Sequence, residues 1–255
     1  FGVKSADYYI EEGITKLESM QTLSGDFEFW PARGYSNPWT SVYVSHFLVE
    51  ARKAGYGVSE RVYKNMIKAM QNHAKAPVKE IWQLEVKVYA CYVLAMAGEP
   101  EKSTMIYLKN NELDRMSDYS QYQLAGAFAF IGDLNTAHSL IPSTVQSREI
   151  KRESGGNFNS PIRSQAIMLS VLAEINPDHP SVPKLIESLA KSASENNRWY
   201  TTQENAFAFL ALGKILKKQP PGKYTGSARV NNTNIGNFSS GDHHFKGKDW
   251  GGKEI

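Results

Sequence analysis

Five stretches of the chain are rich in apolar and small residues on more than one helical face, and they recur about every 34 to 43 residues. A helix that is apolar nearly all round is a buried helix and not a surface helix. Each stretch ends in glycine or in a polar–proline stop, as helix C-termini commonly do. The five predicted inner helices are Thr40–Gly55, Leu84–Gly98, Tyr119–Gly132, Pro161–Ile175 and Thr201–Leu216.

More amphipathic segments, with their charges on one face, lie between the apolar ones. Periods of this length indicate stacked helical hairpins, because a single hairpin cannot bury its own apolar face. One helix of every pair is fully apolar, which favours a closed double ring over an open solenoid. We therefore predict an all-α fold, an α/α-toroid. The predicted outer helices are Tyr8–Gln21, which precedes the first inner helix, Ser59–Ala74 with Ser59 as its cap, Glu101–Asn110, Asp133–Ile141 and Ser181–Ala193.

Two regions interrupt the helical pattern. Residues Ser143–Ser160 are polar, contain Gly155-Gly156, and are predicted to form a long exposed loop. From Gln219 onward the sequence loses its helical character. Short β-prone runs follow, separated by Asn-Asn, Ile-Gly and Ser-Gly pairs. The tail is therefore predicted to hold the opening strands of a second, β-rich module.

Charge and length exclude several classes of protein. The 255 residues carry 29 basic and 26 acidic side chains, and a dispersed net charge of +3 does not indicate a nucleic-acid partner. No run of 18 apolar residues predicts a membrane span. The lone Cys91 excludes a disulfide within these residues and a cysteine-based zinc cluster. Because Cys91 lies inside an apolar helix, we expect a buried, inert thiol.

Particular strings resemble the alpha-2-macroglobulin and complement family, most of all its bacterial branch. These are GDFEFWP (Gly25–Pro31), WTSVYVSHFLVEARKAGY (Trp39–Tyr56) and RWYTTQENAFAFLALGK (Arg198–Lys214). SPIRSQAIMLSVLAEI occupies the place of the preceding inner helix. The likeness covers about residues 5 to 218.

The resemblance implies a thioester domain, a terpenoid cyclase-like α/α-toroid of six hairpins inserted between the two halves of a β-sandwich called the CUB domain. It places the toroid at residues 1–218, and the linker and the start of a CUB-like segment at 219–255. Five pairs are visible, and the chain starts at Phe1 without Met. We therefore expect Phe1 to be a cut point, with the first hairpin truncated upstream.

The implied function is protease trapping. In this family a protease cuts a bait region, and a buried internal thioester then becomes exposed to attack. The chemistry is a single acylation, so the resemblance implies a protease inhibitor and not an enzyme, without a cofactor. The implied partners are target proteases and the neighbouring CUB and macroglobulin-like domains. The implied location is exported, either periplasmic or anchored to the cell envelope.

One departure from the family is large. The thioester forms within a Cys-Xaa-Glu-Gln tetrapeptide, and no such tetrapeptide occurs in these 255 residues. The bond-forming residues either lie upstream of Phe1 or were never present. Two alternatives therefore stay open. One is a thioester-free toroid that binds proteins, and the other is a toroidal enzyme acting on glycans or isoprenoids, for which no converging carboxylates are evident.

Other polar residues have structural interpretations. Complement members use a histidine after the second outer helix, but the motif around His73 does not match, so we interpret it as an exposed helix end. His46 is expected to be a satisfied core group. The pair His243-His244 is expected to face solvent, and Glu11-Glu12 to form a solvated face. His138 and His179 show no ligand spacing. Glu85 and Glu204 begin inner helices, where negative charge suits the helix dipole. We predict no catalytic residue and no metal site.

Aromatic residues gather near the predicted starts of the inner helices. If the inner helices are parallel, their starts share one rim of the ring. Structural packing of the rim and a contact surface for a neighbouring domain or ligand both explain this. The candidate rim residues are Trp30, Tyr35, Trp39, Trp82, Trp199 and Tyr200.

Overall fold

The computed structural model describes residues 4–30, 34–142, 157–194, 198–218, 225–230 and 233–239. The chain divides into two compact units, Phe1–Leu212 and Gly213–Ile255, and the boundary falls inside the last helix. His243 and His244 lie outside the described residues, as does most of the loop predicted at Ser143–Ser160. In the described part of that loop Asn157 and Ser160 are buried, so the prediction of exposure is wrong for them.

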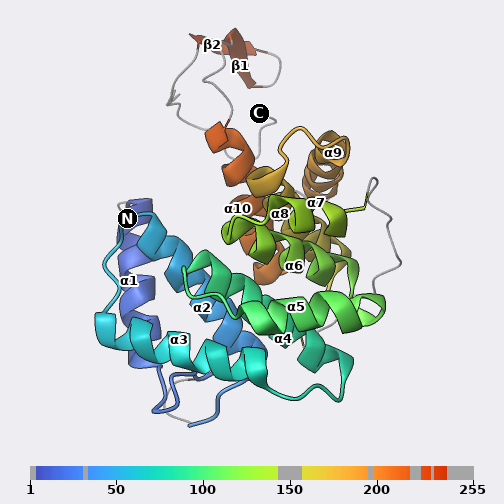
Figure 1. Cartoon of the computed structure of the whole chain (residues 1–255). Helices are drawn as coiled ribbons and strands as arrows, with labels where there is room; N and C mark the ends of the chain where they lie inside the picture. The colour runs from blue at the N-terminus through green and yellow to red at the C-terminus, as the bar shows by residue number, and fades with distance from the viewer. Residues whose placement is uncertain are drawn as a thin grey trace. The chain divides into compact units, whose positions relative to one another are not determined.

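The first unit is helical (Figure 1). Outer and inner helices alternate along the chain, and a short 3-10 turn, η1 (Leu113–Arg115), precedes α6. The outer helices are α1 (Ala6–Ser19), α3 (Glu60–Lys75), α5 (Lys102–Asn111), α7 (Leu134–Leu140) and α9 (Ser181–Ser194). The inner helices are α2 (Pro38–Lys53), α4 (Ile81–Met96), α6 (Asp118–Phe130), α8 (Pro161–Ile175) and α10 (Thr202–Lys218), which runs across the unit boundary.

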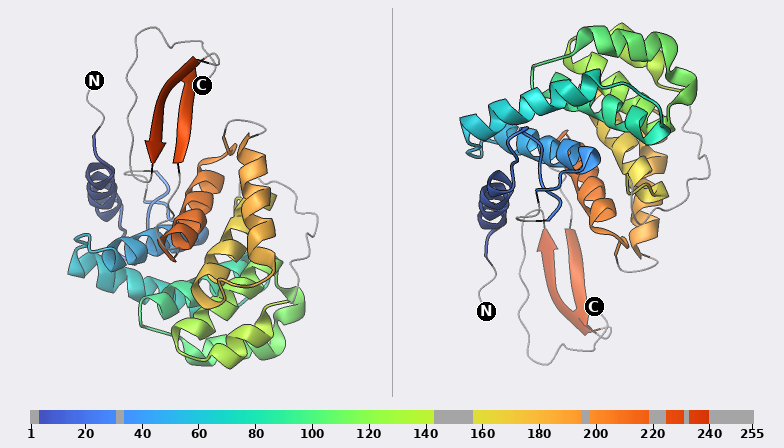
Figure 2. Two further views of the ribbon diagram at one scale, coloured as in Figure 1. Left: turned by 90° about the horizontal axis from the view of Figure 1, so that it is seen from above. Right: turned by 90° about the horizontal axis from the view of Figure 1, so that it is seen from below.

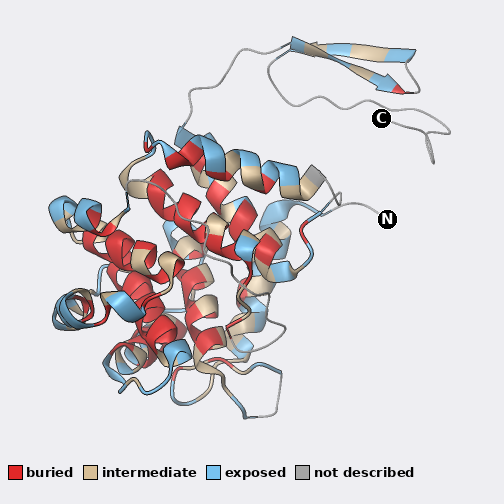
Figure 3. Ribbon diagram, turned by 90° about the vertical axis from the view of Figure 1, so that its right-hand side faces the viewer, coloured by how far each residue is buried: buried red, intermediate tan, exposed pale blue. Residues whose placement is uncertain are grey.

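Burial separates the two sets of helices, as the predominance of buried residues on the inner helices in Figure 3 shows. Helix α4 buries every residue from Leu84 to Met96. Helix α3 buries one side only, with Val62, Met66 and Met70. The prediction of apolar helices sheathed by amphipathic ones is therefore confirmed.

The inner helices close into a ring. Helix α4 lies between α2 and α6, and α6 packs on α8 (Figure 2). Phe207 of α10 contacts both α2 and α8 and so closes the ring. Its ring centroid lies 5.6 Å from that of Tyr43 on α2 and 5.5 Å from the guanidinium carbon of Arg163 on α8. The predicted α/α-toroid is confirmed.

Local signals explain where the helices begin and end. The side chain of Asn37 accepts a hydrogen bond from the Thr40 N–H, and Pro38 occupies the first turn of α2. Gly55 ends that helix with φ +95°, a conformation that glycine adopts at little cost. The prediction for Ser59 is wrong in one respect. Its side chain makes no capping bond, and its N–H instead donates to the Glu18 carboxylate.

The second unit contains a two-stranded antiparallel sheet in its described residues. Strand β1 (Thr225–Val230) pairs with β2 (Thr233–Ser239), and the register shifts between Ala228 and Arg229. The predicted β-rich tail is confirmed. Among the described residues, no helix combines the length and the apolar character that crossing a bilayer requires.

Candidate functional site

The starts of the inner helices adjoin one another, and we call this end of the ring the rim. Asn157 donates hydrogen bonds to the Trp82 carbonyl and to the Glu85 carboxylate, both in the first turns of α4. The ring of Phe158 lies 5.3 Å from that of Trp39 at the start of α2. The residues that lead into α8 therefore contact the starts of α2 and α4.

The six candidate rim residues fall into two groups. Trp30, Tyr35, Trp82 and Tyr200 are exposed. Trp30 and Tyr35 come together around Phe29, which packs edge-on against the Trp30 ring and bonds through its N–H to the Tyr35 carbonyl at 3.2 Å.

The other two candidates are buried and act in packing. Trp39 stacks on Tyr43 with a centroid separation of 5.3 Å. The indole N–H of Trp199 donates to the Leu189 carbonyl of α9 at 3.1 Å. The Trp39 stack lies within α2, whereas the Trp199 bond ties α9 to the segment before α10. Both indoles are buried, which leaves them little surface for a partner.

Arg163, a residue that the sequence analysis missed, occupies the centre of the rim. Its side chain is 0% exposed. The guanidinium lies 5.1 Å from the Trp39 ring, 5.0 Å from the Tyr119 ring and 5.5 Å from the Phe207 ring. It donates to Asn159 Oδ1 at 2.9 Å, and no carboxylate of the described residues forms an ion pair with it. Three aromatic faces therefore surround the buried guanidinium and stabilise its charge through cation–π contacts.

The buried carboxylates of the rim are structural. Glu85 accepts the Asn157 bond described above. The Thr201 N–H donates to Glu204 Oε2 at 3.1 Å, and the Glu204 N–H donates back to the Thr201 hydroxyl at 3.1 Å. This is a capping box at the start of α10. No group of three metal-ligating side chains occurs among the described residues.

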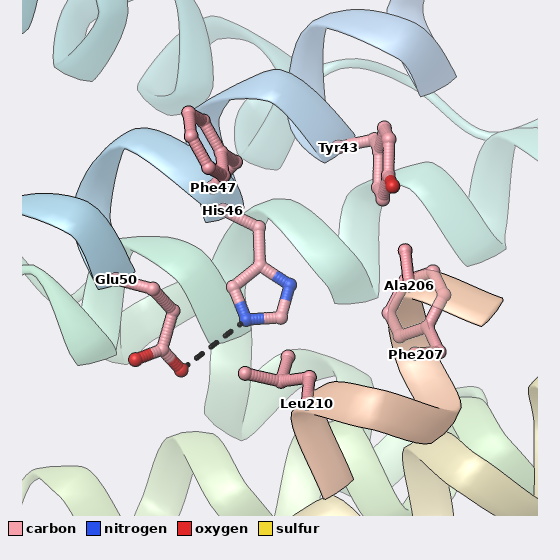
Figure 4. Close-up of a pocket in the computed structure, with 7 residues that line it drawn as sticks. All are labelled: Tyr43, His46, Phe47, Glu50, Ala206, Phe207 and Leu210. Carbon is pink, nitrogen blue, oxygen red and sulfur yellow. Dashed lines mark ion pairs between the residues drawn. The ribbon is translucent and has the colours of Figure 1, made fainter. Parts of the chain in front are cut away.

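A half-open hollow of about 170 Å³ lies between α2 and α10 (Figure 4). His46 faces it and is a buried core residue, as predicted. Its Nδ1 lies 2.7 Å from the Tyr89 hydroxyl and its Nε2 lies 3.6 Å from Glu50 Oε1. The lining is mostly apolar, which suits packing better than catalysis. The lining residues are Tyr43, His46, Phe47, Glu50, Ala206, Phe207 and Leu210.

His73 is not the exposed helix end that the sequence analysis predicted. Its side chain is 16% exposed, and its Nε2 lies 2.6 Å from Asp26 Oδ1. Burial alone would raise the pKa of Asp26, but the hydrogen bond and the charge of His73 lower that pKa below its usual value. The pair ties the segment before α2 to the end of α3.

Cys91 is buried within α4, as predicted. Burial raises the pKa of its thiol to about 12, so almost no thiolate forms at neutral pH. Of the other predicted residues, Glu11, Glu12 and His138 are exposed. His179 is buried, and its Nδ1 accepts a bond from the Ser181 N–H at 3.2 Å.

Sequence and structure comparisons agree on one set of relatives. The chain is 28% identical over 228 residues to alpha-2-macroglobulin of Escherichia coli K12, which is 84% of this chain. It is 26% identical over 239 residues to alpha-2-macroglobulin of Xylella fastidiosa strain Temecula1, which is 86% of this chain. The cryo-EM structure of native E. coli alpha-2-macroglobulin matches 94% of the chain with a TM-score of 0.74 and 25% identity. The chain is homologous to the bacterial alpha-2-macroglobulins.

The similarity concerns one segment of these alpha-2-macroglobulins. The chain spans only 14% of the length of each of the two relatives and 16% of the chain in the cryo-EM structure. A structure described as E. coli alpha-2-macroglobulin activated by porcine elastase matches 92% of this chain and 21% of that one, with a TM-score of 0.69 and 25% identity. No protein-family model matches the chain.

Proposed function

We propose that this chain is the thioester-domain scaffold of a bacterial alpha-2-macroglobulin-like protease trap. The observation that carries the proposal is the match of both sequence and fold to E. coli alpha-2-macroglobulin over most of the chain. The E. coli protein has been solved as activated by porcine elastase, which supports target proteases as partners. The proposed location is exported, either periplasmic or anchored to the cell envelope.

The proposed role is mechanical. A thioester is a good acyl donor that water destroys, so it must stay in a water-excluded site until a protease triggers the trap. A ring whose inner helices are close-packed is rigid enough to carry such a bond and to present it as one body. Acylation consumes the bond once, so the protein acts as an inhibitor and not as an enzyme.

The exposed rim aromatics are the proposed contact surface for neighbouring CUB and macroglobulin-like domains of the same polypeptide. The surface consists of Trp30, Tyr35, Trp82 and Tyr200, whereas Trp39 and Trp199 are buried and are not part of it. Exposed aromatic side chains of this size are typical of interfaces, because each covers a large area and retains a polar group.

We further propose that residues 1–218 form most of a six-hairpin toroid and that residues 219–255 start a CUB-like segment. A sixth hairpin would enter the ring at the hollow between α2 and α10, in place of the direct Tyr43–Phe207 contact. Phe47 and Leu210 support this position, because they leave apolar surface there that other inner helices cover. Phe209 of α10 is also exposed, unlike most large apolar residues of α4, α6 and α8. The proposed occupant is an apolar helix encoded upstream of Phe1.

Substituting Phe47→Glu tests the occupant of the hollow. In the 255-residue chain the new carboxylate reaches water, so we expect a small loss of stability. In a longer protein that includes the upstream hairpin the charge is buried, and the loss should grow by about 3 kcal/mol. Urea unfolding of both lengths measures the difference. Ile106→Glu on the exposed face of α5 is the control and should cost the same in both. Equal losses for Phe47→Glu would contradict the proposal.

Protease trapping is tested with the full-length parent protein and active porcine elastase. We expect elastase to keep its activity toward a small chromogenic peptide and to lose it toward casein, because a trapped protease stays intact but shielded. A covalent conjugate should appear on denaturing gels, and prior treatment with methylamine should abolish it. Undiminished casein cleavage in excess parent protein would refute trapping.

Cys91→Ser is the matched control for the thioester. Because the Cys91 thiol is buried and protonated, we expect its replacement to leave methylamine uptake and the conjugate unchanged. Loss of uptake in this variant would contradict our assignment of Cys91 to the core. Trapping that resists methylamine in both proteins would favour the thioester-free binding toroid.

A further inference from the structure

The four residues before α8, Asn157–Ser160, form a segment that we call the strap. Its first residue bonds to α4. The Asn157 side-chain amide donates to Glu85 Oε2 and, at 3.4 Å, to the Trp82 carbonyl. Asn157 and Glu85 are both buried, so their hydrogen bond forms away from water. A buried polar group that loses such a bond pays its full cost of desolvation.

The rest of the strap contacts α2 and α8. The Phe158 ring packs 5.3 Å from the ring of Trp39. Asn159 accepts a bond from the Arg163 guanidinium at 2.9 Å, and the Ser160 hydroxyl accepts one from the Arg163 N–H at 3.1 Å. Four consecutive residues therefore connect three helices of the ring at the rim.

The strap is strained at its centre. Phe158 has φ +53°, and it is the one non-glycine residue with a positive φ in the part of the chain that the structure describes. This left-handed region is unfavourable for a bulky aromatic residue, because the Cβ approaches the backbone carbonyl oxygen. Such a conformation persists only where the surrounding contacts outweigh its cost. Here those contacts are the Asn157 bonds and the aromatic packing of Phe158 itself.

We propose that the strap is a conformational latch with a closed and an open state. In the closed state the contacts of Asn157 and Phe158 hold the strained backbone over the rim. When Asn157 leaves Glu85, the backbone at Phe158 relaxes, its ring leaves Trp39, and the buried Trp39 and Arg163 become accessible from the rim. The strain favours opening and the contacts favour closure, so a few contacts decide between two discrete states. The latch belongs to this chain and requires no protease and no other domain.

Hydrogen exchange of the full 255-residue chain tests the latch through the amides of residues 158–160 and 162–164. These include the Arg163 and Ser164 N–H groups, which bond to Ser160. Phe158→Ala removes the ring but keeps the strain, and it should speed exchange there at least tenfold while exchange in α9 stays unchanged. Phe158→Gly removes both the ring and the strain, so its strap should exchange more slowly than that of Phe158→Ala.

Two further variants complete the test. Asn157→Ala removes the hydrogen bonds to α4 without removing an apolar side chain, and it should also speed strap exchange. This variant keeps the latch testable if Phe158→Ala does not fold. Ile106→Ala, on the exposed face of α5, should leave the strap unchanged. Unchanged strap exchange in both Asn157→Ala and Phe158→Ala would overturn the latch. So would acceleration spread equally over the helices, or equal exchange in the Ala and Gly variants.

Discussion

Replacing Arg163 by alanine is expected to destabilise the helical unit by about 3–5 kcal/mol, the cost typical of truncating a large buried side chain. The side chain is fully buried, and three aromatic rings face its guanidinium. Truncation empties the centre of the rim and leaves Asn159 Oδ1 without the bond described above. Urea unfolding followed by circular dichroism measures the change.

Two further substitutions at Arg163 separate volume from charge. Arg163→Met keeps most of the volume and removes a buried charge that lacks an ion-pair partner among the described residues, so we expect a loss below about 2 kcal/mol. Arg163→Lys keeps a charge but loses the planar group that stacks on the rings, and it should be less stable than Arg163→Met. A Met variant as unstable as the Ala variant would show that the guanidinium, and not its volume, holds the rim together.

Gly25→Ala is expected to cost about 2–5 kcal/mol, the sum of left-handed strain and overpacking. Gly25 has φ +89°, and a Cβ placed there would lie 2.2 Å from the Asn65 carbonyl oxygen. Because that oxygen belongs to the backbone of α3, it cannot rotate away as a flexible side chain would. The segment before α2 would have to leave α3, and the Asp26–His73 contact would be lost with it.

Gly13→Ala is the matched control. Gly13 lies within α1, and a Cβ there would meet nothing within 4 Å. Alanine is the better helix former, so this variant should be more stable than the parent by about 0.5–1 kcal/mol. Thermal unfolding of both variants provides the comparison. A Gly25→Ala protein within 1 kcal/mol of the parent would show that α3 and the segment before α2 are not in fixed contact.

The spacing of apolar residues along the sequence predicts most of the fold. The all-round apolar character of Leu84–Gly98 predicts an inner helix because only full burial accommodates such a sequence, and the glycine near its end marks the stop. The β-rich tail is equally visible in its turn residues. These features are local, so one window of sequence contains the information that specifies them.

The contacts that build the rim are not local. Asp26 pairs with His73, and Asn157 pairs with Glu85, across long stretches of chain. No sequence pattern near His73 indicates a carboxylate partner, and His73 was therefore predicted to be exposed. Arg163 offered one usable signal, because it is the one positively charged residue of a mostly apolar helix and lies in the first turn. Its aromatic neighbours come from α2, α6 and α10, and only the folded ring brings them together.

Closure of the ring through Phe207 also constrains how the protein is made. Tyr43 leaves the ribosome long before its partner on α10 does, so the ring cannot shut during most of synthesis. Until then α2 exposes apolar surface that has no packing partner. Such surface promotes aggregation and binds chaperones. Contacts between such distant parts of a chain also slow folding. The nascent polypeptide is thus most vulnerable in the interval before its last inner helix emerges.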